Sequence, residues 1–250
     1  MAIGGAFTER LLRDAGLAAG MRVLDIGCGS GDVSFIAADI VGPSGSVVGI
    51  DRQEAALDVA RERAMDLGRD TVEFVCCDVG QPPEGLGLFD AIVGRRVLMY
   101  IPDPVATVRG LVRHLRPGGL LALHEHDATM VPASVRDMPL HRTVQGWLRE
   151  MIRREGADTA MGFNLYGTLT EAGLTVEQVR AEAVVQTPAQ EYPLGEIVRM
   201  VLARIVDQGI ASEAEVDIDT LDARLDEERI GTGATYVGDM MFGASARKPG

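Results

Sequence analysis

The sequence is poor in cysteine and in aromatic residues, and its apolar runs are short. The three cysteines are an odd number, and Cys76 is adjacent to Cys77, so we expect no disulfide framework and a reducing, cytoplasmic compartment. No apolar run is long enough to cross a bilayer as a helix. The first residues lack the basic and then apolar order of a secretion signal, so we expect no leader.

Positive charge is scarce relative to negative charge. The chain has 24 Lys and Arg against 37 Asp and Glu, which gives a formal net charge of −13. Such a chain lacks the broad basic face that binding to nucleic acids or to anionic membranes requires. Much of the excess lies between Asp207 and Ile230, where we expect a solvated helical face, a funnel for a cationic acceptor being the alternative. We therefore expect a small-molecule partner, no nucleic acid and no membrane.

The spacing of apolar residues predicts alternating strands and helices up to about residue 125. Strands are expected at 21–26, 46–50, 72–76, 89–93 and 120–124, and helices at 7–15, 32–41, 53–67 and 104–115. Later helices are expected at 135–154, 167–172 and 194–206, with strands within 174–185 and 235–244. Because the early strands are continuous apolar runs, the pattern predicts an α/β fold with a parallel sheet covered on both faces.

A glycine turn follows the first of these strands. Residues 23–31 read VLDIGCGSG, in which Gly27, Gly29 and Gly31 can adopt backbone angles that side chains disfavour. Parallel sheets bind ligands beyond the carboxyl ends of their strands, where this turn is expected. A nicotinamide dinucleotide usually requires G-x-G-x-x-G, but the last position of that pattern is Asp32, whose carboxylate would repel a pyrophosphate. The alternative cofactor is S-adenosylmethionine, which carries positive charge and no phosphate, so acids close to this turn would favour its binding.

Carboxylates are placed at or near the ends of three strands. Asp25 precedes the glycine turn, Asp51 ends the second strand and Asp78 follows the third. Asp51 can accept both hydroxyls of a ribose, and Asp78 can meet an adenine amino group. The structural alternatives are a loop cap for Asp25, a helix cap for Asp51 and a turn residue for Asp78.

The segment from Met21 to Asp127 resembles the core of class I S-adenosylmethionine-dependent methyltransferases. The resemblance rests on VLDIGCGSG, VVGID, VEFVCCDV, FDAIVGRRVLMYIPDP and LRPGGLLALHEHD, which occur in the order and spacing of that family. The last two are similar to the small-molecule branch, which includes ubiquinone and menaquinone methyltransferase-like enzymes. The resemblance covers a little under half of the chain strongly. It implies a Rossmann-like, doubly wound sheet of seven strands, with the last strand antiparallel and inserted beside the fifth.

The resemblance also implies which residues bind the cofactor. Asp25 would act near the methionine ammonium, Asp51 would hold the ribose, Asp78 and Val79 would bind the adenine, and Arg95 would offer its backbone carbonyl to the ammonium. The complete predicted set of cofactor-binding residues is Asp25, Gly27, Cys28, Gly29, Asp51, Arg52, Cys77, Asp78, Val79, Arg95 and Arg96. Of these, Cys28 is expected to be a small filler in the turn and not a nucleophile.

Candidate bases follow the fifth strand. If that strand persists, His124 and His126 share one face while Glu125 points the other way. We expect His126 and His141 to be the catalytic bases, and the resemblance implies that Tyr100 faces the transferred methyl region. Hydrogen bonding within the loop is the alternative for each histidine. The His-x-His-Asp pattern could bind a metal, but the segment lacks a carboxylate-rich set and we expect no metal.

We expect one methyltransferase domain with a cofactor-binding core at 1–127 and helical, substrate-covering insertions at 128–166 and 191–230, the second of which could also form a dimer surface. The predicted activity is methyl transfer to an O, N or C atom of a small, fairly apolar molecule, such as a secondary metabolite or a quinone-like ring. Two alternatives are a protein of the same fold that uses the cofactor without methylation, for example in a cyclisation, and a less favoured NAD-dependent oxidoreductase. The apolar residues expected to form the acceptor pocket are Met138, Leu140, Trp147, Met151, Met161, Phe163 and Tyr166.

Overall fold

A computed structural model describes residues 4–250. Its strands are β1 (Arg22–Ile26), β2 (Ser46–Asp51), β3 (Val72–Cys76), β4 (Phe89–Arg95), β5 (Leu115–Asp127), β6 (Ala133–Ser134), β7 (Thr175–Gln186) and β8 (Tyr236–Arg247). Its α-helices are α1 (Gly5–Asp14), α2 (Asp32–Val41), α3 (Glu54–Asp66), α4 (Pro104–Leu111), α5 (Pro139–Arg154), α6 (Met161–Glu171), α7 (Leu194–Asp207), α8 (Glu213–Val216) and α9 (Ile218–Thr232). Short 3-10 helices include η2 (Leu98–Tyr100).

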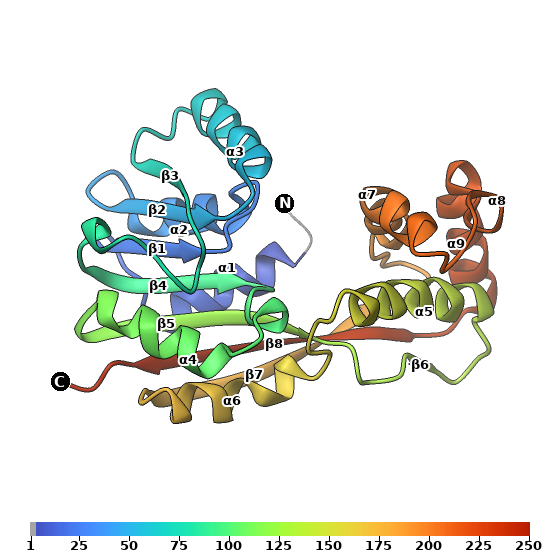
Figure 1. The fold of residues 1–250 in the computed structure, drawn as a ribbon. Coiled ribbons are helices and arrows are strands. Elements are labelled where there is room, and N and C mark those ends of the chain that lie inside the picture. Colours follow the sequence, from blue (N-terminus) through green and yellow to red (C-terminus); the bar gives the residue numbers. More distant parts are fainter. Residues whose placement is uncertain (1–3) are drawn as a thin grey trace. The chain divides into compact units, whose positions relative to one another are not determined.

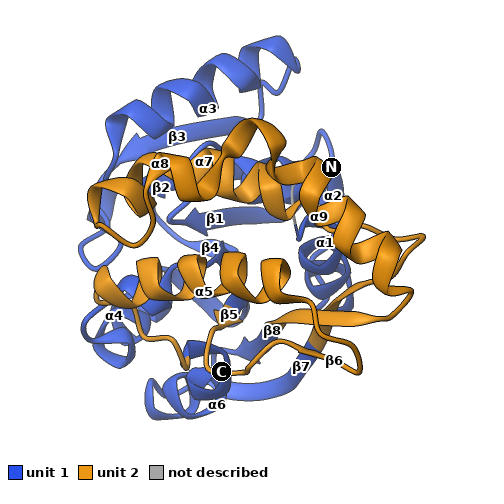
Figure 2. Cartoon of the chain, turned by 90° about the vertical axis from the view of Figure 1, so that its right-hand side faces the viewer, with its two compact units in different colours: residues 1–125, 161–181, 242–250 blue, residues 126–160, 182–241 orange. Residues whose placement is uncertain are grey.

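The chain divides into two compact units, which Figure 2 shows in different colours. Unit 1 comprises residues 1–125, 161–181 and 242–250, and unit 2 comprises residues 126–160 and 182–241. The core predicted at 1–127 and the substrate-covering insertions predicted at 128–166 and 191–230 are a division by function, which these two units do not test, and it stays a prediction. Strands β5, β7 and β8 each contain a boundary between the units, so a single strand contributes residues to both.

Unit 1 is built on a parallel sheet. β1 lies between β2 and β4, β3 pairs with β2, and β5 pairs with β4, all of them parallel. In Figure 1, helices α4 and α6 lie in front of this sheet and α1 and α2 lie behind it. Because both faces are covered, the central strands are buried along most of their length, as β1 and β2 show.

The last strand lies beside the fifth, and its direction is opposite. Strand order runs β3-β2-β1-β4-β5-β8, and β7 also pairs with β8. Lys248, just after β8, exchanges backbone hydrogen bonds with Gly118 and Gly119, which lie near the beginning of β5. The predicted Rossmann-like α/β class, with an antiparallel last strand beside the fifth, is therefore confirmed. The sheet has eight strands and not seven, because the two-residue β6 pairs antiparallel with β8 in unit 2.

Several expected element boundaries differ from those observed. The helix expected at 7–15 begins at Gly5, and Thr8 is buried within it, where its hydroxyl lies 2.9 Å from His124 Nδ1. The helix expected at 135–154 begins at Pro139, because proline is favoured in the first turn of a helix. The helix expected at 167–172 begins six residues earlier, at Met161.

Unit 2 has a core of its own. Three of its helices, α5, α7 and α9, pack against one another, and Val198, Ile205 and Leu221 are fully buried between them. The acidic stretch that begins at Asp207 forms α8 and most of α9, with Val216, Leu221 and Leu225 turned into this core.

We expect Leu221→Ala to lower the free energy of unfolding by about 2–5 kcal/mol, because it removes a fully buried leucine and leaves a cavity. Met200→Ala is the matched control in the same unit, since that side chain is 65% exposed and its loss should change stability little. Urea unfolding followed by circular dichroism measures both. Equal stability of the two variants would contradict a packed core around Leu221.

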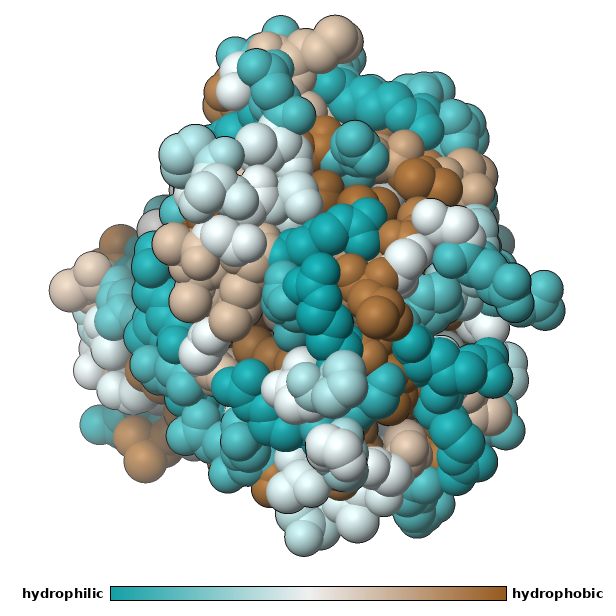
Figure 3. Space-filling model, turned by 90° about the vertical axis from the view of Figure 1, so that its left-hand side faces the viewer, coloured by the Kyte–Doolittle hydropathy of each residue, from teal (hydrophilic) through white to brown (hydrophobic). Residues whose placement is uncertain are grey.

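The surface is mixed in character. Figure 3 shows apolar residues exposed among hydrophilic ones on the face it presents. Met65, Leu67 and Leu88 are among the large apolar side chains that are exposed in unit 1. Among residues 4–250, no helix has the length and apolar character needed to cross a membrane.

Candidate functional site

The glycine turn lies at the carboxyl end of β1, within unit 1. Gly27, Gly29 and Gly31 have φ angles of 57°, 52° and 88°, the left-handed region in which side chains are strained. The Cys28 amide donates to the Ile50 carbonyl, and the Gly31 amide donates to the Cys28 carbonyl. These bonds hold the turn against the end of β2. Helix α2 begins directly after the turn, at Asp32.

The three glycines have different surroundings. A Cβ atom on Gly27 would meet Val97 at 2.7 Å, and a Cβ on Gly31 would meet Phe35 at 2.9 Å, so these two glycines are required by packing. A Cβ on Gly29 would meet nothing within 4 Å. The backbone at Gly29 therefore borders open space, which is the feature expected where a ligand passes close to the main chain.

Asp51 anchors the turn from the end of β2. Its Oδ2 accepts a hydrogen bond from the Gly29 amide at 2.9 Å, and its Oδ1 accepts one from the Gln53 amide, also at 2.9 Å. The carboxylate is half-buried. It is thus fixed beside Gly29 and at the same time bonds Gln53, the residue before α3, as in an Asx turn; the helix itself has no side-chain cap, so the expected cap at Asp51 is not observed.

Asp25 has no exposed surface. Its Oδ2 accepts a hydrogen bond from the Ser34 hydroxyl at 2.6 Å, and its Oδ1 has no partner among the described residues. Burial raises the pKa of Asp25 to about 7. Burial likewise raises the pKa of the Cys28 thiol, which fits a packed filler and not a nucleophile.

The carboxylate of Asp32, at the start of α2, is paired twice. It lies 3.0 Å from Arg63 Nη1 and 2.9 Å from Arg95 Nη2. These guanidinium groups compensate its charge, so the expected repulsion of a pyrophosphate by Asp32 loses its force. What still distinguishes the turn from a dinucleotide site is the absence of a third glycine at position 32, which close packing of the helix on the strand requires there.

The end of β3 lies next to the end of β2. The Cys77 amide donates to the Asp51 carbonyl at 3.0 Å, and Cys76 Sγ lies 3.7 Å from the Arg52 carbonyl oxygen. Asp78 is exposed and accepts a hydrogen bond from the Gly80 amide at 2.7 Å, as the turn interpretation expected. Val79 is buried beside it. The structure thus brings Arg52, Cys77 and the Asp78 backbone together at one edge of unit 1.

The turn after β4 is strained and is held by Glu125, which the sequence offered only as one of the candidate bases after the fifth strand. Arg96 has a φ angle of 57°, which is uncommon for a residue with a side chain, and its amide donates to the His124 carbonyl. Glu125 is fully buried, and its Oε1 accepts hydrogen bonds from the amides of Val97 at 3.0 Å and Leu98 at 2.8 Å. Glu125 therefore fixes Val97 against Gly27 and supports the start of η2.

A sequence signal for Glu125 did exist. It is an acid within an apolar strand, on the face opposite to His124 and His126, and a buried acid needs a partner. Its Oε2 has no partner among the described residues, and burial raises its pKa to about 7. Arg95 is the last residue of β4, directly before this turn, and its side chain is largely buried. Its backbone carbonyl was expected to contact the methionine ammonium of the cofactor.

The three predicted catalytic residues have separate environments. Tyr100 belongs to η2 of unit 1 and is 42% exposed. In unit 2, His126 Nε2 lies 3.3 Å from Asp239 Oδ1, and His141 Nδ1 lies 2.7 Å from Glu228 Oε2. Each histidine thus has its own carboxylate partner, an arrangement that can orient the ring.

Most residues of the expected apolar acceptor pocket pack inside one unit or the other. Met138 and Met151 are buried in unit 2, where Leu140 and Trp147 also pack against the core. In unit 1, Met161 is buried, whereas Phe163 and Tyr166 are exposed on α6, with the ring of Phe163 4.8 Å from that of Phe242. The buried members of this set therefore contribute to packing within their own units, and the acceptor pocket stays a prediction.

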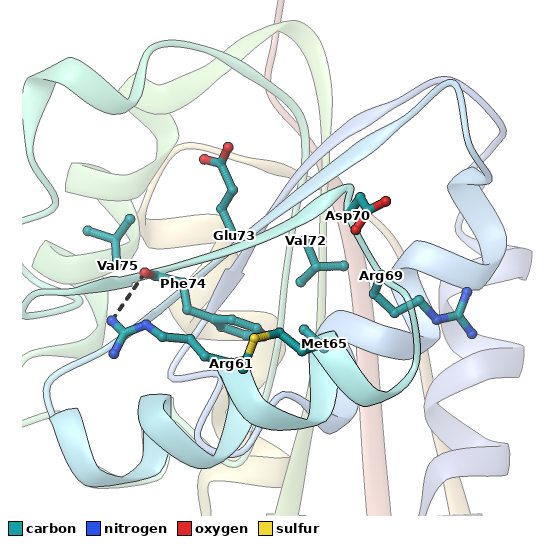
Figure 4. Close-up of a pocket in the computed structure, with 9 residues that line it drawn as sticks. Arg61, Met65, Arg69, Asp70, Val72, Glu73, Phe74 and Val75 are labelled. Atoms are coloured by element: carbon teal, nitrogen blue, oxygen red, sulfur yellow. Dashed lines mark hydrogen bonds between the residues drawn. The ribbon is translucent and has the colours of Figure 1, made fainter.

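Figure 4 shows a cavity of about 500 Å³ in unit 1 that is distinct from the glycine turn. It lies between α3 and β3, and Arg61, Met65, Phe74 and Val75 are among its lining residues. None of the predicted site residues lines it. Among residues 4–250, no cluster of three or more His, Cys, Asp or Glu side chains is placed to hold a metal ion.

Comparisons with known proteins agree with this geometry. Residues 17–173 match the family model described as a methyltransferase domain. A demethylmenaquinone methyltransferase from Staphylococcus aureus is 31% identical over 124 residues, which are 50% of this chain and 51% of that protein. The chain therefore spans about half the length of the curated relatives it matches.

Two solved structures show the same fold. A putative methyltransferase from Bacillus halodurans has a TM-score of 0.63 at 20% identity and covers 98% of this chain and 100% of its own. Phosphoethanolamine N-methyltransferase 2 from Haemonchus contortus, in complex with S-adenosyl-L-methionine, has a TM-score of 0.60 at 20% identity, with coverage of 98% and 53%.

The doubly wound sheet, with a glycine turn and acids at the carboxyl ends of its strands, defines a Rossmann-like, nucleoside-binding class of protein. The family match covers more than half of the chain, and the chain belongs to the methyltransferase-domain family. The predicted class, a class I S-adenosylmethionine-dependent methyltransferase, is confirmed, and so is the predicted cofactor.

Proposed function

We propose that this protein transfers a methyl group from S-adenosylmethionine to a small, fairly apolar molecule. The observation that carries the proposal is the glycine turn of unit 1, where the backbone at Gly29 borders open space and the Asp51 carboxylate is fixed beside it. An acid at that position suits a cofactor with a free ribose diol and a positive charge. A quinone-like ring is the acceptor class that the demethylmenaquinone methyltransferase suggests.

The proposed cofactor site uses the ends of four strands. Asp51 would hold the ribose, Asp78 and Val79 the adenine, and the Arg95 carbonyl the ammonium. Further predicted contacts are Asp25, Gly27, Cys28, Gly29, Arg52, Cys77 and Arg96. Asp25 fits a supporting position better than a direct one, because its carboxyl is fully buried and bonded to Ser34. S-adenosylmethionine supplies an activated methyl group, so the protein mainly has to align the acceptor with it.

Proton removal from the acceptor is proposed for His126 or His141. A base is needed only where the acceptor keeps its proton at the working pH, as a hydroxyl or a carbon often does. Asp239 and Glu228 would stabilise the protonated rings, since each lies within 3.3 Å of its histidine. Tyr100, which is partly exposed, is proposed to face the transferred methyl group.

The remaining properties of the protein follow from its charge and its composition. With a net charge of −13, we propose a small-molecule partner and no nucleic-acid partner. We propose a cytoplasmic location on the basis of three cysteines without a disulfide pattern. The substrate-covering role of residues 128–166 and 191–230, and a homodimer surface on the second of these, are part of the same proposal.

Asp51→Ala tests the cofactor site. We expect the affinity for S-adenosylmethionine to fall at least about tenfold, because the variant loses the carboxylate proposed to bind the ribose and also its bond to the Gly29 amide. Isothermal titration calorimetry measures this affinity, and Asp39→Ala is the control, an acid of unit 1 whose ion pair with Arg69 lies outside the proposed site. Unchanged affinity in Asp51→Ala would remove Asp51 from the site.

The reaction itself is tested by the mass of the product. Incubation with S-adenosylmethionine and a reduced demethylmenaquinone analogue should yield a product heavier by one methyl group, together with S-adenosylhomocysteine. A product of unchanged mass would favour a role for the cofactor without methylation, such as a cyclisation. An increase in NADH fluorescence on mixing would instead support an oxidoreductase and contradict the proposal.

A further inference from the structure

Unit 2 contains a cavity of its own, of about 390 Å³, a size within the range of small-molecule sites. It lies among α5, the end of β7, the beginning of α7 and the middle of α9. Its lining is mostly polar, and it comprises His141, Gln186, Glu191, Tyr192, Pro193, Leu194, Gly195, Glu196, Arg199, Asp222, Leu225, Asp226 and Arg229.

A buried donor without a partner lies in this lining. Gln186 is only 2% exposed, and its Nε2 has no hydrogen-bond partner among the described residues. A buried donor left without an acceptor costs about 1–3 kcal/mol. Native proteins keep such groups rarely, and a ligand oxygen that accepts from Gln186 would remove the cost.

His141 supplies the complementary group. Its Nδ1 lies 2.7 Å from Glu228 Oε2, and Glu228 also accepts hydrogen bonds from the amides of Leu140 and His141. A carboxylate with three donors is an acceptor only, so His141 donates through Nδ1 and its Nε2 carries a lone pair. The cavity is therefore lined by one buried side chain with an unpartnered donor and by one with a lone pair, a combination that a ligand hydroxyl can satisfy.

The charge of the lining selects against anions. Both arginines have partners: Arg229 donates to the carbonyls of Thr187 and Pro188 and to Asp226, and Arg199 donates to Asp222. Four acids against two arginines leave the lining negative at neutral pH. Glu191 and Glu196 are exposed, at positions where a cation entering from solvent can meet them.

We propose that unit 2 binds a small hydroxylated amine in this cavity, with a ligand hydroxyl between Gln186 and His141 and the ammonium near the exposed acids. The proposal concerns binding alone and does not depend on the glycine turn of unit 1. It shares His141 with the proposed function, so a ligand bound there would leave His126 as the base for methyl transfer. Failure of glucosamine to bind would leave the proposed function as it stands.

The test uses the full chain and glucosamine, a compact molecule in which an ammonium adjoins several hydroxyls. Saturation-transfer difference NMR at neutral pH, where His141 can keep its lone pair and most of the amine is protonated, compares glucosamine with glucose, which lacks the charge, and with gluconate, which reverses it. We expect glucosamine to bind, glucose to bind at least about tenfold more weakly and gluconate not to bind.

Two variants locate the site. Gln186→Leu should weaken glucosamine binding at least about tenfold while stability is unchanged or higher, because an unsatisfied donor is removed. Glu196→Gln changes an exposed side chain, so it should fold normally and lower the affinity for glucosamine but not for glucose. Glu213→Gln, an exposed acid of unit 2 outside the cavity, should change neither. Absence of glucosamine binding, equal binding of the three sugars, or full binding by Gln186→Leu would each overturn the proposal.

Discussion

Gly29→Ala lowers the affinity for S-adenosylmethionine at least about tenfold, roughly 1.4 kcal/mol, as an expected result. The added methyl group meets no atom of the chain within 4 Å, so it enters the open space beside the turn that the cofactor is proposed to occupy. The substitution also places a side chain at a φ angle of 52°, which costs about 1–2 kcal/mol of stability. Calorimetric titration and thermal unfolding separate the two effects.

Gly68→Ala is a closely matched control for this prediction. Gly68 has a φ angle of 61° and likewise no atom within 4 Å of an added Cβ, but it follows α3 and lies outside the proposed site. The Gly68→Ala variant should therefore have the same backbone strain as Gly29→Ala but keep the full affinity for S-adenosylmethionine. If both variants bind the cofactor equally well, the space at Gly29 is not a binding surface. If both lose binding equally, general destabilisation explains the loss.

Glu125→Ala lowers the free energy of unfolding by roughly 2–5 kcal/mol, as a second expected result. The amides of Val97 and Leu98 lose their acceptor inside the protein, and a cavity replaces the side chain. Glu125→Gln keeps a carbonyl oxygen in the place of Oε1 and should retain most of the stability. Glu73→Gln, an exposed strand acid of unit 1, is the control and should behave as the wild type.

The pH dependence of stability gives Glu125 a distinct signature. Burial raises its pKa from 4.5 to about 7, so between these values the folded protein holds a proton that the unfolded chain releases. The contribution of Glu125 to the free energy of unfolding is therefore highest below about pH 4.5. It falls as the pH rises to about 7 and is constant above that value. Glu125→Gln lacks this loss, so its stability relative to the wild type should increase over that window.

Urea titrations of the wild type and Glu125→Gln at a series of pH values measure the difference. Asp25, whose pKa is also raised to about 7, contributes a similar fall to both proteins, so the informative quantity is the difference between the two curves. A difference that does not change with pH would show that Glu125 is ionised in the folded state across this range. Equal stability of the Ala and Gln variants would contradict its role in holding the turn after β4.

Local sequence signals determined the first half of the fold closely. The helix expected at 32–41 and the strand expected at 72–76 have the observed bounds, because each is an apolar pattern that ends at glycine or at a polar turn. The glycine turn and the acids at the strand ends were identified for the same reason, since strand, turn and helix are consecutive in the chain. The site residues inferred there remain predictions until the cofactor experiments are done.

The second half was predicted less well. Its helices α5, α7 and α9 pack on one another, so the alternation of strands and helices that identified the first half does not apply to them. Gly167 was taken as the beginning of a helix, yet it lies within α6. The pairs His126–Asp239 and His141–Glu228 join residues about one hundred positions apart, and no spacing in the sequence reveals such pairs. The same holds for Arg229, whose guanidinium is buried against the carbonyls of Thr187 and Pro188.

The sequence by itself determined the class of the protein, the order of its elements and the place of its glycine turn, because these depend on neighbours along the chain. Only the tertiary structure decided which charges are compensated and which buried groups lack partners. It showed that Asp32 is neutralised by Arg63 and Arg95, that Glu125 holds the turn after β4, and that Gln186 lies unpartnered in a cavity. The energies of such groups depend on burial and distance in three dimensions, which a linear pattern does not contain.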